Sequence, residues 1–170
     1  MSDDRRTLVL LRHAKSSYPD NVADHDRPLA SRGEREAGLV GEWLRSGVVD
    51  PQVEAVLCST ATRTRQTLAR TGVDAPVQFI DRLYGAMPGG VIGEINAVAD
   101  DIRTLLVIGH EPAMSSVALA LAGAEGSNES AAEQISFKYP TSALAVLRVS
   151  GSWQDLALGG AALETFYVPR

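Results

Sequence analysis

Four side chains that could do chemistry on a phosphoryl group follow three short apolar runs of the chain: Arg12, His13, Arg63 and His110. Two guanidinium groups aimed at one point make an anion site, because arginine binds phosphate oxygens in bidentate fashion. A neutral imidazole in such a site can attack phosphorus in line and form a phosphohistidine intermediate. The positive field of the arginines disfavours an imidazolium, so we expect His13 to stay unprotonated and nucleophilic.

The other three side chains would serve the transfer of the phosphoryl group. Arg12 and Arg63 would compensate charge on the phosphoryl oxygens as the transfer proceeds. His110 would either donate a hydrogen bond to a phosphoryl oxygen or help with a proton. Water must then attack the phosphohistidine to regenerate the free imidazole. Because the arginines already supply positive charge, we expect neither a metal ion nor a cofactor.

Alternating strand and helix patterns place these residues. The apolar runs fit strands that are covered on both faces, and a helical pattern follows each of them. This alternation predicts an α/β fold with a largely parallel sheet, in which ligands bind outside the carboxyl ends of the strands. We therefore expect the four side chains to converge on one edge. The expected strands span residues 7–11, 53–58, 105–108, 77–80, 143–149 and 163–168; the expected helices span 33–46, 62–71 and 112–121, and a loop is expected over 122–133.

Length and composition narrow the class of protein. The chain has 170 residues, of which 45% are hydrophobic and 22% charged, so we expect a single domain over residues 1–170. The net charge of −5 argues against binding to nucleic acid or to an anionic membrane, both of which need a basic surface. Cys58 is the one cysteine of the sequence, which excludes an intramolecular disulfide and suits a reducing compartment. No apolar stretch has the length of a membrane span, so we expect a cytoplasmic protein.

Four segments together resemble a known family. They are LVLLRHAKS (8–16), DRPLASRG (26–33), CSTATRTRQT (58–67) and VIGHEPAM (107–114). Their order and spacing are similar to those of the histidine phosphatase superfamily, and more narrowly to its SixA branch of phosphohistidine phosphatases. The resemblance implies a phosphoglycerate mutase-like three-layer α/β/α sandwich with a mostly parallel central sheet and no large lid insertion. It also implies that His13 is the nucleophile and that Arg12, Arg63 and His110 form the phosphate pocket.

The chain departs from the family pattern in two places. Ala14 stands where most branches carry glycine, as is common in the SixA-like group. The phosphomonoesterase branches use a carboxylate as general acid after the third strand, where this chain offers Asp81 and Glu94, neither in a good motif. An alkoxide is a poor leaving group that needs a proton donor, whereas the P–N bond of phosphohistidine is more labile. A site with a weak acid therefore suits phosphoramidates better than alkyl phosphate esters.

Several other residues near these motifs admit two interpretations. Arg27 either reaches the phosphate or forms a salt bridge with Asp24 or Asp26, and Ser16 is a candidate contact with substrate. The run Asp24-His25-Asp26 is interpreted as a solvated loop, because adjacent residues rarely converge on one metal ion. We expect Cys58 to be a buried strand thiol, and the segment 139–142 to border the site. Core positions are expected for Trp43, Leu44 and Phe79.

Three functions remain for such a site. The first is a metal-independent phosphatase that acts on a phosphorylated protein, with phosphohistidine as the phosphorylated residue. The second is a broad phosphomonoesterase for small phosphate esters, with Asp81 or Glu94 as the acid. The third is a non-catalytic module that binds phosphoproteins, against which the intact set of two histidines and two arginines argues.

Overall fold

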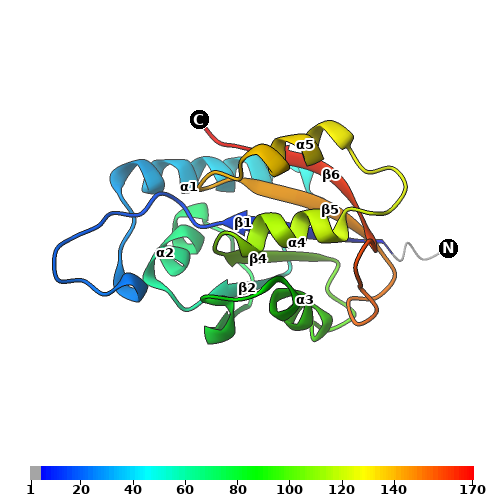
Figure 1. Cartoon of the computed structure of the whole chain (residues 1–170), viewed down its shortest axis with the longest axis horizontal. Helices are drawn as coiled ribbons and strands as arrows, with labels where there is room; N and C mark the ends of the chain where they lie inside the picture. Colours follow the sequence, from blue (N-terminus) through cyan, green and yellow to red (C-terminus); the bar gives the residue numbers. More distant parts are fainter. Residues whose placement is uncertain (1–4) are drawn as a thin grey trace.

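The computed structural model describes residues 5–170, and its centre is a six-stranded sheet with the strand order β3-β2-β4-β1-β5-β6 (Figure 1). Strands β1 to β4 pair in parallel, whereas β5 pairs antiparallel with both β1 and β6. The mostly parallel sheet is therefore confirmed, with an antiparallel edge. The strands are β1 (Arg5–Arg12), β2 (Ala55–Ser59), β3 (Val77–Ile80), β4 (Thr104–Gly109), β5 (Leu144–Ser150) and β6 (Ala161–Tyr167).

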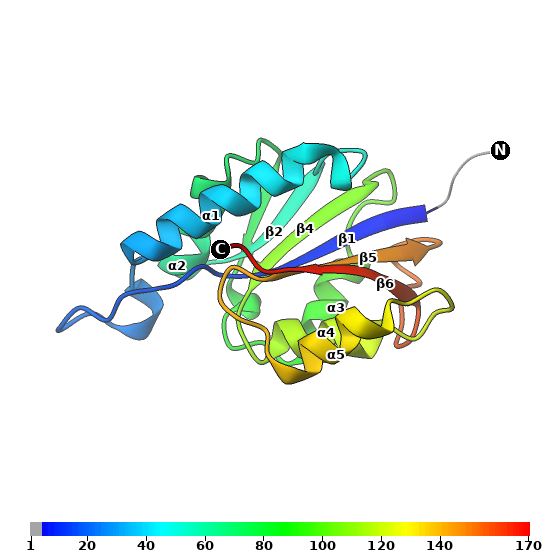
Figure 2. The ribbon, with the colours of Figure 1, turned by 90° about the horizontal axis from the view of Figure 1, so that it is seen from above.

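Helices cover both faces of this sheet and make three layers. Figure 2 shows α1 and α2 on one face and α3, α4 and α5 on the other. The α/β/α sandwich is thus confirmed. The helices are α1 (Ser31–Trp43), α2 (Thr62–Thr71), α3 (Pro88–Asn96), α4 (Ala113–Leu121) and α5 (Glu129–Phe137), with short helical turns at Asp24–Asp26, Leu44–Val48 and Asp81–Leu83. Within residues 5–170, no helix is long and apolar enough to cross a membrane.

Both faces of strand β1 are buried over residues 8–11, which is why this stretch is apolar throughout instead of alternating with polar residues. Leu8 and Leu10 pack with the α3, α4 and α5 side of the core, whereas Val9 and Leu11 pack with the α1 and α2 side. All four side chains are buried, as successive strand residues must be when both faces of a sheet are covered.

Three details differ from the sequence-based expectations. Helix α5 begins at Glu129, inside the expected loop 122–133, because the Asn128 side chain caps it by accepting from the Ala131 N–H at 3.0 Å. Helix α3 was not expected from its glycine-rich sequence; it forms by burying an apolar face. Phe79 is 45% exposed rather than in the core, because β3 is an edge strand and the ring lies under the Arg65 guanidinium.

Candidate active site

The carboxyl ends of three neighbouring strands bring the predicted residues together. Strand β1 ends at Arg12, which pairs in register with Gly109 at the end of β4, and the His13 N–H donates to the Gly109 carbonyl at 3.0 Å. Arg63 stands in the first turn of α2, just after β2. All four predicted residues line one pocket of about 240 Å³. Its full lining is Arg12, His13, Lys15, Ser16, Tyr18, Arg27, Arg63, His110, Glu111 and Thr141.

A backbone contact fixes the tautomer of the His13 ring. Its Nδ1 lies 2.8 Å from the Ala14 carbonyl oxygen, which can only accept, so Nδ1 carries the proton and Nε2 the free lone pair. Burial is the main reason that the pKa of His13 falls to about 3. The charges of His110, Arg63 and Arg12 lower this pKa further, whereas the hydrogen bond to Ala14 raises it. The arginines thus contribute less than expected from the sequence. His13 is therefore neutral at physiological pH.

Three residues that line the pocket carry a buried side-chain nitrogen that no group in the described part of the chain pairs with. Within residues 5–170, Nε of Arg12, Nε of Arg63 and Nδ1 of His110 are buried without a hydrogen-bond partner. Buried donors are normally paired, and leaving one unsatisfied costs about 1–3 kcal/mol. These nitrogens belong to three residues that line the same pocket as His13, and a tetrahedral oxyanion bound there would offer them hydrogen-bond acceptors.

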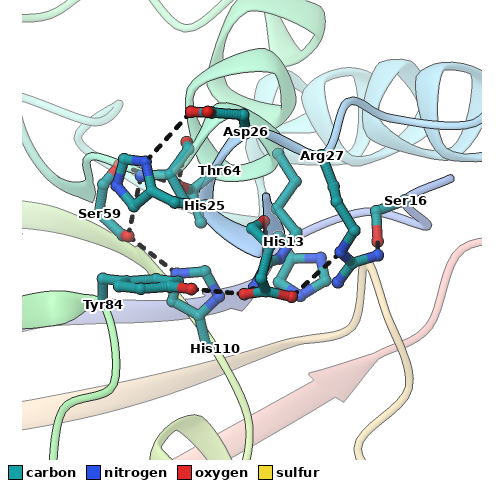
Figure 3. Close-up of polar contacts among 12 residues, drawn as sticks. His13, Ser16, His25, Asp26, Arg27, Ser59, Thr64, Tyr84 and His110 are labelled. Carbon is teal, nitrogen blue, oxygen red and sulfur yellow. Dashed lines mark hydrogen bonds and ion pairs between the residues drawn. The ribbon is translucent and has the colours of Figure 1, made fainter. Parts of the chain in front are cut away.

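Asp24 anchors the arginines of this pocket. Arg63 donates to the Asp24 carbonyl at 2.7 Å and to its carboxylate at 3.1 Å, and Arg27 donates to the other carboxylate oxygen at 3.1 Å. The Tyr84 hydroxyl also donates to this carboxylate, which is the main cause of the lowered pKa of Asp24. The expected salt bridge of Arg27 with Asp24 is confirmed. Arg27 also donates to the Ser16 hydroxyl at 2.8 Å (Figure 3) and lines the pocket, so its contact with a phosphate stays a prediction.

Sequence reasoning named Asp24 as one of two candidate partners of Arg27 but missed its contact with Arg63, and it missed Tyr84 altogether. Both residues come from loops without periodicity. Asp24 sits in a charged run that was interpreted as solvated loop, and its carboxylate is indeed 56% exposed. The pairing of Asp24 with Arg27, three residues further along the chain, is the one contact of this carboxylate that the sequence predicted. Tyr84 follows the turn after β3 and left no comparable signal.

Substitution of Asp24 by asparagine should weaken substrate binding by about tenfold. Arg63 and Arg27 would lose their ionic anchor, and an ordered guanidinium is what makes a bidentate contact with phosphate effective. We expect KM to rise more than kcat falls, measured on a phosphoramidate substrate. Tyr84→Phe is the matched control, since it removes one hydrogen bond to Asp24 and leaves both ion pairs. An unchanged KM in Asp24→Asn would contradict the anchoring role.

The two carboxylates proposed as general acid lie outside the pocket lining. Asp81 accepts a hydrogen bond from Thr60 at 2.7 Å, and Glu94 is paired with Arg82 at 2.6 Å. Glu111 does line the pocket, and its carboxylate accepts from the backbone N–H and hydroxyl of Ser115 at 2.6 and 2.7 Å. Its position next to His110 in the sequence is the signal from which Glu111 could have been predicted.

Cys58 and the segment 139–142 lie where the sequence predicted them. Cys58 is buried, and burial raises its pKa to about 12, which makes the thiol inert. Thr141 borders the pocket, and the Tyr139 carbonyl accepts from Arg12 at 2.8 Å. Within residues 5–170, no three His, Cys, Asp or Glu side chains cluster as metal ligands would.

The family model for the histidine phosphatase superfamily (branch 1) matches residues 8–101, more than half of the chain. The chain belongs to the histidine phosphatase superfamily. A protein of Mycobacterium tuberculosis, itself uncharacterised, is 62% identical over 160 residues, which cover 94% of this chain and 100% of the relative.

Within the superfamily, the chain is similar to the SixA branch. A structure from Nakamurella multipartitia, provisionally named a phosphohistidine phosphatase SixA, has 41% sequence identity and a TM-score of 0.88, covering 97% of this chain and 96% of that one. The phosphohistidine phosphatase SixA of Escherichia coli is 30% identical over 112 residues, 62% of this chain and 67% of the relative. The SixA-like resemblance is thereby confirmed.

The buried histidines of this superfamily member should make its stability depend on pH. The pKa of His13 falls to about 3 and that of His110 to about 4, both mainly by burial, from an ordinary value of 6.5. Between pH 6.5 and 4 the unfolded chain binds more protons than the folded one, so the free energy of unfolding should fall as pH falls through this window. Urea denaturation at pH 7, 5.5 and 4.5 measures it.

A histidine variant isolates this effect from the carboxylates. His13→Asn lacks one of the two groups, so its free energy of unfolding should fall less between pH 6.5 and 4.5 than that of the wild type. An equal fall in both proteins would show that His13 is not buried in its neutral form.

Proposed function

We propose that this protein is a metal-independent phosphatase that cleaves phosphohistidine in proteins through a phosphohistidine intermediate on His13. The observation that carries the proposal is that three residues with buried nitrogens unpaired within residues 5–170 line one pocket with a neutral imidazole whose Nε2 lone pair is free. The SixA likeness supports the same substrate class.

The proposed reaction has two steps. The His13 Nε2 lone pair attacks phosphorus as the P–N bond of the substrate breaks and its electron pair leaves with the substrate nitrogen. Arg12, Arg63 and His110 donate to the three phosphoryl oxygens, whose charge they stabilise. Water then attacks the phosphorus of phosphohistidine 13, which releases inorganic phosphate and returns the electron pair to Nε2.

Labelling tests both the chemistry and the enzyme class. The protein is incubated with ³²P-labelled phosphoramidate, quenched in alkali, and digested for mass spectrometry. We expect a label that is stable in alkali, labile in acid and located on His13, because P–N bonds hydrolyse in acid. Binding of phosphate without any label would favour the non-catalytic phosphoprotein-binding module instead. A panel of a phosphohistidine peptide, a phosphoserine peptide and an alkyl phosphate then ranks substrates, and clear preference for the ester would contradict the proposed substrate.

The phosphomonoesterase is the second candidate, and the Glu111 carboxylate in the pocket is the observation that favours it. Only a true general acid is needed more for the worse leaving group. If Glu111 is that acid, Glu111→Gln should lose more activity on an alkyl than on an aryl phosphate. Glutamine keeps an oxygen for the Ser115 N–H, so the start of α4 is preserved. We expect equal, small effects on both esters, as for a residue that only caps the helix.

A further inference from the structure

His110 is held between the Ser59 hydroxyl and the pocket. Its Nε2 lies 2.8 Å from the Ser59 Oγ, and both side chains are buried. In Figure 3 the other ring nitrogen, Nδ1, points away from Ser59 toward His13. This is the nitrogen that has no hydrogen-bond partner within residues 5–170. The protein therefore fixes one ring nitrogen, Nε2, and leaves the other, Nδ1, for a ligand.

The contacts of Ser59 determine which atom donates in this hydrogen bond. Its Oγ accepts from the Ala61 N–H at 3.3 Å, and among residues 5–170 its own proton meets no acceptor other than His110 Nε2. If Nε2 carried the proton, the Ser59 hydroxyl would be buried with an unsatisfied proton, and the bare lone pair of Nδ1 would face the phosphoryl oxygens. Each of these defects costs about 1–3 kcal/mol.

We infer that Ser59 is a positioning residue that donates its hydroxyl proton to Nε2 of His110, and so fixes the tautomer with the proton on Nδ1, aimed at the phosphoryl group. The inference rests on the proposed function for the identity of the ligand. Burial lowers the pKa of His110 to about 4, so the ring is neutral and the tautomer matters at physiological pH.

This tautomer decides between the two roles that the sequence left open for His110. A neutral imidazole that gave up its Nδ1 proton would become an imidazolate, so His110 holds this proton throughout the reaction. It is a hydrogen-bond donor to the phosphoryl oxygen and does not protonate the leaving group. A leaving nitrogen that takes its proton from solvent, as in a phosphoramidate, fits such a site better than an alkoxide.

Nitrogen NMR tests the tautomer independently of activity. The chain has three histidines, so ¹⁵N-histidine labelling gives few signals, which single variants assign. At pH 7 we expect His110 to show a protonated Nδ1 and an unprotonated Nε2, with the Nδ1 proton moving downfield when inorganic phosphate binds. Ser59→Ala should give a mixture of tautomers. A protonated Nε2 in the wild type would overturn the inference even if His13 is labelled as proposed.

Two substitutions of His110 test the same geometry without altering Ser59. The asparagine amide lies near the position of Nδ1, whereas the glutamine amide reaches the position of Nε2. We expect His110→Asn to bind inorganic phosphate at least about tenfold more tightly than His110→Gln. Equal affinities would contradict the assignment of the donor to Nδ1.

The Ser59 variant has a matched control in the same strand. Ser59→Ala should weaken phosphate inhibition about tenfold, because the tautomer with a proton on Nδ1 is no longer enforced. Cys58→Ala removes one buried atom from the neighbouring position, outside the pocket lining, and should leave inhibition unchanged. If both variants shift inhibition equally, the effect is one of packing and the inference fails.

Discussion

His13→Ala will abolish turnover of a phosphohistidine peptide, by at least about four orders of magnitude in kcat, while binding of inorganic phosphate is partly retained. The loss follows from removal of the Nε2 lone pair, which is the nucleophile of the proposed mechanism. Binding persists because Arg12, Arg63 and His110 keep their unsatisfied donors. Rapid-quench kinetics measure the first effect and phosphate titration the second.

A variant of another histidine controls for general damage. His25 does not line the pocket, and His25→Ala should still acquire the label on residue 13. Thermal unfolding of His13→Ala should remain cooperative, which separates loss of chemistry from loss of fold. Turnover above 1% of the wild type in His13→Ala would assign the nucleophile to another residue and end the proposed mechanism.

The convergence of the four site residues was predictable because it follows from topology. Parallel neighbouring strands place their carboxyl ends at one edge, so polar residues after β1, β2 and β4 must meet there. The apolar runs identified these strands to within about three residues, since a strand buried on both faces leaves an unbroken hydrophobic pattern. The site residues could be predicted because each of them lies within a few residues of the carboxyl end of its strand.

The anchoring of that site was not predictable, because it depends on where loops fold back. Asp24 lies 39 residues from Arg63 in the chain, yet binds it through both its backbone and its carboxylate. Tyr84 reaches the same carboxylate across 60 residues. Sequence periodicity carries no information about such contacts. A run of charged residues such as 24–26 is interpreted as a solvated loop unless the fold is known to bring a buried guanidinium, here that of Arg63, next to it. The neutral state of His13 was predicted correctly, but its main cause, burial, is a property of the assembled pocket.

Gly33 supports the loop that follows His13, and its replacement by alanine should damage both stability and activity. A Cβ at Gly33 would lie 2.1 Å from the Lys15 carbonyl oxygen, a backbone atom that already accepts from the Ala30 N–H at 2.9 Å. Real contacts are never this short, so the 14–17 loop must move away from α1. We expect a loss of about 1–3 kcal/mol in the free energy of unfolding.

The same displacement should lower kcat/KM by about two orders of magnitude. Lys15 and Ser16 line the pocket, and a shift of about 1 Å in a positioning group can cost a hundredfold in rate. Steady-state kinetics on the folded fraction, with urea denaturation alongside, measure both effects.

Two glycines of the same helix separate the possible causes. A Cβ at Gly38 would meet nothing within 4 Å, so Gly38→Ala should stabilise the helix by about 0.5–1 kcal/mol. A Cβ at Gly41 would lie 2.0 Å from the Thr71 carbonyl oxygen, at the contact of α1 with the end of α2 and away from the pocket lining. Gly41→Ala should therefore lose stability while its folded fraction keeps normal kcat/KM. If Gly33→Ala behaved like Gly41→Ala, the packing of the loop on α1 would serve the fold alone, and the orientation of His13 would have to come from its hydrogen bonds to Ala14 and Gly109.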